Sequence, residues 1–281
     1  MLGRGLFALK RGAQSAAVNT DKIRCTVEKS TNIKHILSTA KPGSLAILDI
    51  DDTIGRVGQS IGLDAWFRYR MQQYALEGHT ESQALLNAIA LYNRVQKATT
   101  HMVCVDPDND IAELIQQLKD RGVKVIGLTA RNHELTDKTI ELLHTLGVTF
   151  SDDVLKDGVF LLNDKLVEIK NGIIFSDGSN KGLCLEQAVE NKYFLTDFTS
   201  FVDVSFTDDS AKNCEHVALS LAKLGYPNAM VWHYTFAEEY LPFTNEAKTI
   251  AAIQESNLRD YKFLFTDDEA REQIGTGNYP I

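Results

Sequence analysis

The sequence has little cysteine, and its cysteines form no pattern typical of a metal site or a disulfide scaffold. Its 281 residues contain four cysteines, Cys25, Cys104, Cys184 and Cys214, and no two of them have C-x-x-C spacing. Cysteines this widely spread fit reduced thiols better than a disulfide framework or a zinc site. The seven histidines are also scattered, without an H-E-x-x-H or similar pattern of metal ligands.

A long apolar run and an excess of basic charge are both missing. No apolar segment is long enough to span a bilayer, so we expect no transmembrane segment. The formal net charge of -9 argues against broad binding to nucleic acid or to a membrane surface. With 44% hydrophobic and 24% charged residues, the composition is that of a globular protein with a sizeable core and a small insertion.

The first twenty residues leave the localisation open. Residues 1–20 carry basic but no acidic side chains, and their apolar part, Leu6–Leu9, is too short for a signal-peptide core and is followed by Lys10. A targeting segment is therefore an alternative to a frayed N-terminal arm. We expect a cytoplasmic protein, or one secreted without an obvious signal peptide.

The most informative segment is an apolar run that ends in acidic residues. Residues 45–53 have the sequence LAILDIDDT, so Asp49 and Asp51 follow an expected buried strand. Ionised carboxylates are avoided at such a place unless something neutralises them. Both can reach the crevice beyond the carboxyl ends of a parallel sheet, where Mg²⁺ binds carboxylates together with phosphate oxygens. An aspartate can also accept a phosphoryl group, although an acidic loop without chemistry is the simpler alternative.

Three later segments carry further polar residues in positions that suit the same site. An apolar strand ends at Thr129, and a second one leads into Asp208 and Asp209. Lys181 opens an amphipathic segment, where the helix dipole favours anions, so a lysine makes sense there if it points at an anionic centre. The alternatives are a helix-capping threonine and a solvated lysine.

In this order, the four segments resemble the four motifs of the haloacid dehalogenase-like phosphatases of the Asp-x-Asp-x-Thr type. The resemblance extends over about residues 44–235 and is strongest toward the bacterial acid-phosphatase-like and uncharacterised branches. It implies a three-layer α/β/α Rossmann-like core with a central parallel sheet and a small helical cap inserted after the first strand. It also implies a Mg²⁺-dependent phosphatase that hydrolyses phosphomonoesters through an aspartyl-phosphate intermediate.

The resemblance gives each motif residue a role. Asp49 is implied to be the nucleophile and Asp51 the general acid and base, and Thr129 and Lys181 complete the catalytic set. The implied substrate-binding residues are Thr53, Thr129, Ala130, Arg131 and Lys181. The implied metal ligands are Asp49, Asp51 (through its backbone carbonyl), Asp208 and Asp209. Substrate contact and a surface salt bridge are equal alternatives for Arg131, and Asp52 is expected behind the metal ligands or in solvent.

The spacing of the first two motifs predicts an inserted cap. About three helices are expected between their strands, although a parallel crossover needs one, so we interpret residues 56–102 as a helical cap. The aromatic and basic run at 66–70 could face substrate, but packing between the cap helices is the simpler interpretation. Short strands are expected near 158–162 and 172–175, with a hairpin turn signal at Asn171-Gly172. The other expected parts are a core of residues 44–55 and 103–235, an N-terminal arm with a lead-in helix at 1–43, and a C-terminal helical extension packed on the core at 236–281.

The motifs do not identify the substrate. Within the family it resembles, a helical cap suits small phosphometabolites, whereas an open face admits phosphotyrosine or other protein sites. The expected partner is therefore a phosphorylated small molecule or a phosphoprotein. Three alternatives stay open: a phosphoprotein phosphatase acting as a secreted effector, a phosphotransferase, and a non-catalytic interaction protein on the same fold.

Overall fold

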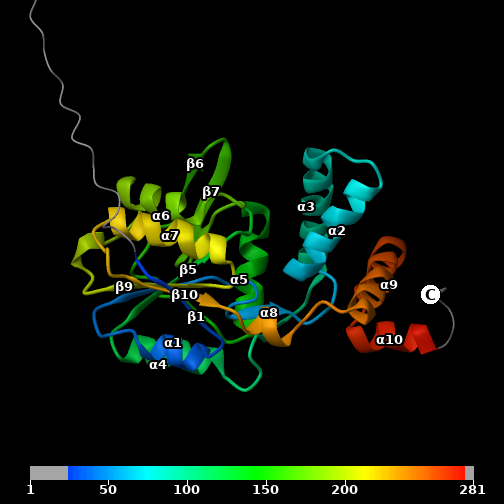
Figure 1. Ribbon diagram of the computed structural model, residues 1–281, viewed down its shortest axis with the longest axis horizontal. Helices are drawn as coiled ribbons and strands as arrows, with labels where there is room; N and C mark the ends of the chain where they lie inside the picture. Colours follow the sequence, from blue (N-terminus) through cyan, green and yellow to red (C-terminus); the bar gives the residue numbers. More distant parts are fainter. Residues whose placement is uncertain (1–24, 276–281) are drawn as a thin grey trace, which may run out of the picture.

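The computed structural model describes residues 25–275, which form a mixed α/β fold around an eight-stranded sheet (Figure 1). The strand order is β1-β10-β9-β2-β5-β8-β7-β6. The strands are β1 (Val27–Ser30), β2 (Leu45–Leu48), β5 (Lys124–Thr129), β6 (Gly158–Leu162), β7 (Lys165–Lys170), β8 (Ile173–Phe175), β9 (Val204–Asp208) and β10 (Met230–Tyr234). Strands from β1 to β8 in this order pair in parallel, and β7 and β6 are antiparallel, so the sheet is mostly parallel.

Helices cover both faces of the sheet and make the three-layer α/β/α architecture, which confirms the expected fold class (Figure 1). The helices of one face are α6 (Lys181–Glu190) and α7 (Ala211–Lys223), and those of the other are α1 (Ile33–Ser38), α4 (Ile111–Asp120) and α5 (Thr136–Thr145). The central strand β2 serves both layers because successive side chains of a strand point to opposite faces. Leu45 and Ile47 belong to the α6–α7 core, and Ala46 and Leu48 to the other.

Strand β2 ends at the point of the sheet where the chain connections to one side give way to connections to the other side. Its neighbours are β5 on one side and β9 on the other, both parallel to it, with Leu48 beside Gly127 and Thr207. Open α/β sheets bind their ligands in the crevice at such a point, outside the carboxyl ends of the strands. The residues after β2, β5 and β9 therefore meet at one edge of the molecule.

The expected cap forms a separate helical pair beside this edge (Figure 1). It consists of α2 (Asp64–Leu76) and α3 (Glu81–Ala98), and the antiparallel strands β3 (Gly55–Val57) and β4 (Met102–Cys104) join it to the core. Gly78, with φ +89°, allows the chain to turn after α2. Thr80 and Gln83 then start α3 with a reciprocal capping box.

The C-terminal extension differs from the expectation that all of it packs on the core. Its helices are α8 (Phe236–Tyr240), α9 (Asn245–Tyr261) and α10 (Asp267–Gly275). Only α8 packs on the core, through Ala237. Ala251 and Leu258 of α9 instead share an apolar cluster with Trp66 and Val95 of the cap, because α9 carries a second apolar face besides the one that packs on Ala270 of α10.

Polar contacts fix the C-terminal helices to the base of the cap. The buried Gln254 of α9 accepts a hydrogen bond from the Ile61 N–H (3.0 Å) and donates one to Asp267 (2.9 Å). Asp267 in turn accepts hydrogen bonds from the backbone N–H and the hydroxyl of Ser60, both at 2.7 Å. The cap and the C-terminal helices α9 and α10 thus form one packed unit.

Several short elements go beyond the sequence expectations. Strand β7 lies between the two predicted strands and joins them in a meander, with the expected turn at Asn171-Gly172 confirmed between β7 and β8. Asn163 and Asp164 make the other tight turn, both with positive φ, as such hairpins require. The lead-in helix is confirmed as α1, whereas residues 1–24 of the expected arm lie outside the described residues.

Candidate functional site

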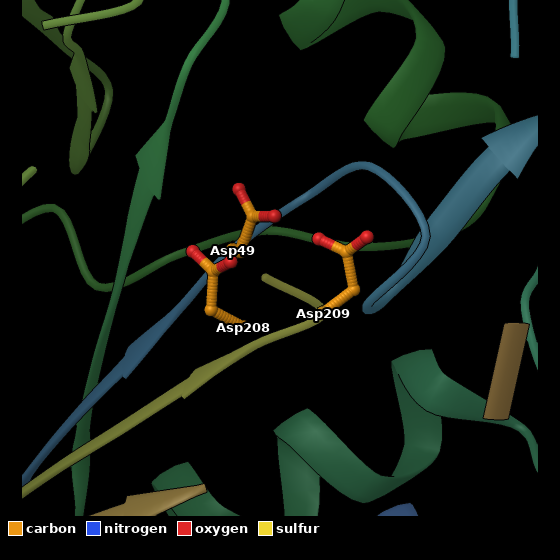
Figure 2. Close-up of side chains that lie close together, drawn as sticks. All are labelled: Asp49, Asp208 and Asp209. Carbon is orange, nitrogen blue, oxygen red and sulfur yellow. The ribbon is translucent and has the colours of Figure 1, made fainter. Parts of the chain in front are cut away.

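Three predicted metal ligands converge at the carboxyl ends of two neighbouring strands. Asp49 follows β2, Asp208 ends β9, and Asp209 comes next. Each offers a carboxylate oxygen, and these oxygens all lie within 4.8 Å of one another. Figure 2 shows the three side chains grouped at the ends of the two strands. Their convergence follows from the parallel register of β2 and β9, which brings both strand ends to the same edge.

The side chain of Lys181 enters this cluster from the first residue of α6. It is 1% exposed, and its Nζ lies 2.5 Å from Asp49 Oδ1 and 2.7 Å from Asp208 Oδ2. The next residue, Gly182, allows this approach, since a Cβ there would lie 2.4 Å from the carbonyl oxygen of His216 on α7. The close packing of α6 on α7 therefore sets where Lys181 points.

The charges of the cluster do not balance. Burial raises the pKa of Asp49 well above its usual value, although Lys181 opposes the shift. Burial also raises the pKa of Asp209, and the charges of Asp49 and Asp208 add to that rise. Burial lowers the pKa of Lys181, but Asp208 and Asp49 hold it above its ordinary value, so Lys181 stays protonated. One ammonium thus faces three carboxylates, and the excess negative charge suits a cation.

The carboxylates of Asp208 and Asp209 differ in what is left to bind a ligand. Asp208 Oδ1 accepts hydrogen bonds from the Ser210 N–H (2.8 Å) and from Asn213 Nδ2 (3.1 Å), while Oδ2 accepts from Lys181. Within residues 25–275 the carboxylate of Asp209 makes no hydrogen bond or ion pair, and its backbone carbonyl lies 2.9 Å from His233 Nε2. Asp209 is therefore the better placed of the two to coordinate a cation directly.

Asp51 forms a bidentate ion pair with Arg131. Arg131 Nε lies 2.8 Å from Asp51 Oδ2, and Nη2 lies 2.8 Å from Oδ1. Arg131 is 3% exposed and also donates from Nη1 to Thr139 Oγ1 (3.1 Å). Arg131 therefore forms a salt bridge, as one alternative predicted, but its guanidinium is buried and not at the surface, and it holds a predicted catalytic carboxylate in place. The two residues are 80 positions apart, so the sequence carried no local signal for this pair.

The predicted hydroxyl groups lie behind the site. Thr129 is fully buried, and its Oγ1 accepts a hydrogen bond from the Arg131 N–H (3.2 Å). Thr53 is 1% exposed, and its hydroxyl has no hydrogen-bond partner within the described chain. Ala130 lines the cleft above the carboxylates, whereas neither threonine does. The structure thus brings Ala130 to the candidate site surface and places both hydroxyls beneath it.

Asp52 is buried, which excludes the alternative that it lies in solvent. It has a left-handed backbone with φ +52°, and its Oδ1 lies 3.8 Å from Arg56 Nε. Burial raises the pKa of Asp52 to about 6, although Arg56 opposes the shift. The folded protein therefore binds a proton at Asp52 at pH values where the unfolded chain has already lost it.

This shift predicts a pH-dependent gain in stability for Asp52→Asn. Since the folded pKa is raised, the ionised carboxylate destabilises the fold, and the destabilisation develops as pH rises from about 4 to about 6. At pH 7 we expect the variant to exceed the wild type by about 2 kcal/mol in the free energy of unfolding, and by little at pH 4. Urea unfolding of both proteins across this range measures the difference.

The control for this experiment is Asp108→Asn, which removes an exposed carboxylate. Its difference from the wild type is expected to stay within about 0.5 kcal/mol at every pH. A stability difference for Asp52→Asn that does not grow between pH 4 and pH 7 would contradict the assigned shift.

The carboxylates form the floor of a cleft of about 380 Å³ that the cap overhangs. Sequence reasoning gave no role to several of the residues that line it. These are Asp64, Leu85, Ile89, Tyr92, Asn93, Lys165, Asp177, Ser210 and Asn213. Phe67 and Arg68, from the run at 66–70 that could face substrate, also line the cleft, whereas Trp66 packs inside the cap. The cap residues of α3 recur at helical spacing, which from the sequence alone indicates packing. A larger surface hollow of about 510 Å³ near His144 contains none of the candidate site residues.

Comparison with known families places nearly all of the described residues in one family. The model of the family DUF2608, described as a protein of unknown function, matches residues 26–271. The chain belongs to this family. The match includes the core, the cap and most of the C-terminal helices, so these parts make up one DUF2608 unit, and every candidate site residue lies within it.

A curated relative of this DUF2608 protein is named as a putative outer membrane protein of Chlamydia pneumoniae. The two are 27% identical over 145 residues, which cover 51% of this chain and 53% of the relative. The matched part thus spans about half the length of that relative. Among the helices of residues 25–275, none combines the length and apolar character needed to cross a membrane.

Proposed function

We propose that this DUF2608 protein is a Mg²⁺-dependent phosphatase that hydrolyses phosphomonoesters through an aspartyl-phosphate intermediate. The observation that carries the proposal is the convergence of Asp49, Asp208 and Asp209 with the buried Lys181 at one strand edge. Lys181 is 132 positions from Asp49, and the two nevertheless meet. These are the residues that the resemblance to the haloacid dehalogenase-like phosphatases assigns to the chemistry.

The donor atoms fit a hard divalent cation. They are carboxylate oxygens with an excess of negative charge, which is the set that Mg²⁺ prefers, and no sulfur or imidazole ligand belongs to the described cluster. Asp49 and Asp209 would hold the ion, with the backbone carbonyl of Asp51 and the more constrained Asp208 as further ligands. When bound, Mg²⁺ would neutralise negative charge on the phosphoryl oxygens, so that an anionic nucleophile can approach phosphorus.

The side chains of this protein then perform two displacements at phosphorus. Asp49 attacks phosphorus and forms an O–P bond, while the bond to the leaving oxygen breaks and that oxygen takes its electron pair and a proton from Asp51. In the second step Asp51 takes a proton from water, the water oxygen bonds to phosphorus, and phosphate leaves Asp49. Lys181 stabilises the negative charge in both steps.

The bidentate pair of Arg131 with Asp51 affects the two steps differently. Two hydrogen bonds from the guanidinium fix the orientation of both Asp51 oxygens, and this carboxylate accepts a proton from water in the second step. The first step needs Asp51 protonated when the leaving group is a poor one. Arg131 is therefore a positioning residue that supports hydrolysis of the aspartyl-phosphate most strongly.

The test of the proposal is hydrolysis of para-nitrophenyl phosphate with and without Mg²⁺. We expect Mg²⁺-dependent release of phosphate, and we expect the peptide containing Asp49 to gain one phosphoryl group in samples quenched during turnover. Added acceptor alcohols separate hydrolysis from phosphotransfer, since a phosphotransferase forms the alkyl phosphate. Absence of turnover over a panel of phosphometabolites and phosphopeptides, in protein that binds Mg²⁺, would overturn the proposal.

Arg131→Lys is expected to produce a burst with para-nitrophenyl phosphate. Nitrophenolate needs no proton to leave, so the first step stays fast, whereas the second step slows about 10- to 100-fold because lysine cannot hold both carboxylate oxygens. Rapid mixing should show about one equivalent of nitrophenol per protein before the slow steady state. Arg121→Lys, which changes an arginine bonded to the Leu37 carbonyl, is the control without a burst. An unchanged steady-state rate without a burst contradicts the positioning role.

A further inference from the structure

The cleft above the carboxylates has a charged floor and an apolar wall. Asp49, Asp209 and Lys181 belong to the floor. The wall comes from the cap and consists of Phe67 on α2 with Leu85, Ile89 and Tyr92 on α3. The three α3 residues lie at positions i, i+4 and i+7 and therefore share one side of the helix. We refer to these four side chains as the cap wall.

The cap wall belongs only in part to the packing inside the cap. Phe67 and Tyr92 pack against the cluster of Trp66 and Val95, whereas Leu85 and Ile89 belong to none of the apolar clusters of residues 25–275. Helix α3 packs with its buried Ala84, Ala88 and Val95, and Val95 belongs to the apolar cluster that includes Trp66. Leu85 is 39% exposed, and Ile89 is partly buried. Helix α3 thus keeps a second apolar face turned to the cleft, where water contact is unfavourable and an apolar ligand group would be favoured.

Two aromatic rings give the cap wall a defined shape. The rings of Phe67 and Tyr92 meet edge to face, with centroids 5.7 Å apart and an interplanar angle of 82°. Within residues 25–275 the Tyr92 hydroxyl makes no hydrogen bond, and its pKa is raised by burial and further by the charge of Asp51. The phenol therefore stands near the Asp51–Arg131 pair and is available to a ligand.

The basic side chains of the cleft are already engaged. Lys181 is paired with Asp49 and Asp208, and Arg131 with Asp51. The other two are Arg68, which lies 2.5 Å from Asp64, and Lys165, whose Nζ donates to the Asp177 carbonyl at 2.7 Å. Among the described basic residues of the cleft, Lys165 is thus the one without a carboxylate partner, and it is exposed. The part of the substrate that packs on the cap wall is therefore apolar, because none of the four cap-wall side chains carries a charge.

The volume limits the size of this part. Small-molecule sites in proteins span roughly 300–1,000 Å³, and the cleft, at about 380 Å³, is at the low end. A phosphoryl group on the floor therefore leaves space against the cap wall for a small leaving group such as one ring.

We propose that the substrate is a small phosphomonoester whose leaving group carries one flat, uncharged apolar ring that packs on Phe67, Ile89 and Tyr92. This proposal rests on the proposed function, because it places the phosphoryl group at Asp49. Leu85 covers the outer edge of the ring, and Ile89 lies at the centre of the wall along α3.

The first test measures binding without turnover, using two phosphonates that cannot be hydrolysed. In the presence of Mg²⁺, calorimetry should show phenylphosphonate binding about 10- to 100-fold more tightly than methylphosphonate, since only the former buries a ring. Ile89→Ala should weaken phenylphosphonate binding about 5- to 20-fold and leave methylphosphonate binding unchanged. The matched control is Leu86→Ala, which removes the neighbouring leucine of α3 that is 66% exposed and does not line the cleft.

The second test compares benzyl phosphate with glycerol phosphate, which both release alcohols and so depend similarly on protonation of the leaving oxygen. We expect kcat/KM to favour benzyl phosphate by about 10-fold or more, and Ile89→Ala to lower this preference while Leu86→Ala keeps it. Equal use of both substrates, together with equal binding of the two phosphonates, would overturn the ring-binding role and leave the phosphatase proposal intact.

The remaining outcomes separate the two proposals. A preference for phenylphosphonate that Ile89→Ala abolishes supports the cap wall as a ring site even without turnover, and in that case only the proposed catalysis is overturned. A phosphotyrosine peptide that displaces phenylphosphonate at lower concentration than free phosphotyrosine would overturn the limit to small molecules. A preference that Ile89→Ala and Leu86→Ala leave equally unchanged would show that the ring binds away from the cap wall, and would overturn the proposal.

Discussion

Asp49→Asn is expected to abolish Mg²⁺-dependent phosphate release, with a loss in kcat of about 10⁴-fold or more, because an amide cannot attack phosphorus. The asparagine keeps the shape of the side chain at the end of β2 but loses its nucleophilic charge. Phosphate release by the purified variant and the wild type, each with and without Mg²⁺, measures the effect. Retained turnover in a pure sample would rule out Asp49 as the nucleophile.

The same substitution should leave the fold intact. Asp49 is one of three clustered carboxylates, and burial raises its pKa, so its ionised form destabilises the metal-free protein at neutral pH. Lys181 keeps its ion pair with Asp208 when Asp49 is replaced. We therefore expect a thermal midpoint in EDTA equal to or above that of the wild type. Asp52→Asn is the matched control, since it also neutralises a buried carboxylate and is expected to keep its turnover.

Lys181→Met is expected to have the largest effect on stability. It removes the only basic side chain bonded to Asp49 and Asp208 within the described chain, and methionine fills a similar volume without charge. Loss of one partner from a buried ion pair costs about 3–5 kcal/mol, because the remaining charges stay buried and unpaired. We expect a loss of this size in the free energy of unfolding without Mg²⁺, and partial recovery with Mg²⁺ as the cation replaces the missing charge.

Chemical denaturation with and without Mg²⁺ measures this loss, and vanadate inhibition measures the lost contact with a phosphoryl analogue. Lys165→Met is the control because it alters an exposed lysine of the same cleft, bonded to a backbone carbonyl, and should cost less than about 1 kcal/mol. Wild-type stability of Lys181→Met in EDTA, or vanadate inhibition equal to that of the wild type, would contradict the role of Lys181.

The sequence predicts those parts of the fold whose signals are local. The uninterrupted apolar run of β2 identifies a strand buried on both faces, and the carboxylates that follow it identify the edge at which a site lies. The parallel arrangement of the sheet then follows, since the helices alternate with the strands. The resemblance of the four motif segments then implies that Asp49, Asp208 and Asp209 meet, and the structure brings them together.

The parts that could not be predicted depend on contacts between distant segments. Strand β1 has the sequence VEKS and no apolar alternation, and it is a strand because β10 offers it a parallel edge. Tertiary packing likewise determines that Arg131 pairs with Asp51 and that α9 packs on the cap. The apolar residues of α3 recur with a helical period, and this period is the same whether they face a neighbouring helix or a cleft. The sequence alone therefore does not show which of the two they face.

The attachment of α9 to the cap has a consequence for the order in which the protein is completed during its synthesis. Ile61, at the base of the cap, bonds to Gln254, which is made 193 residues later. The strands that carry the carboxylates, and helix α6 with Lys181, can assemble once β10 has left the ribosome. At that stage Trp66 and Val95 still lack their contacts with Ala251 and Leu258. A nascent chain at this stage has an assembled core and a cap whose apolar surface is still exposed. Exposed apolar surface favours chaperone binding or aggregation during this interval.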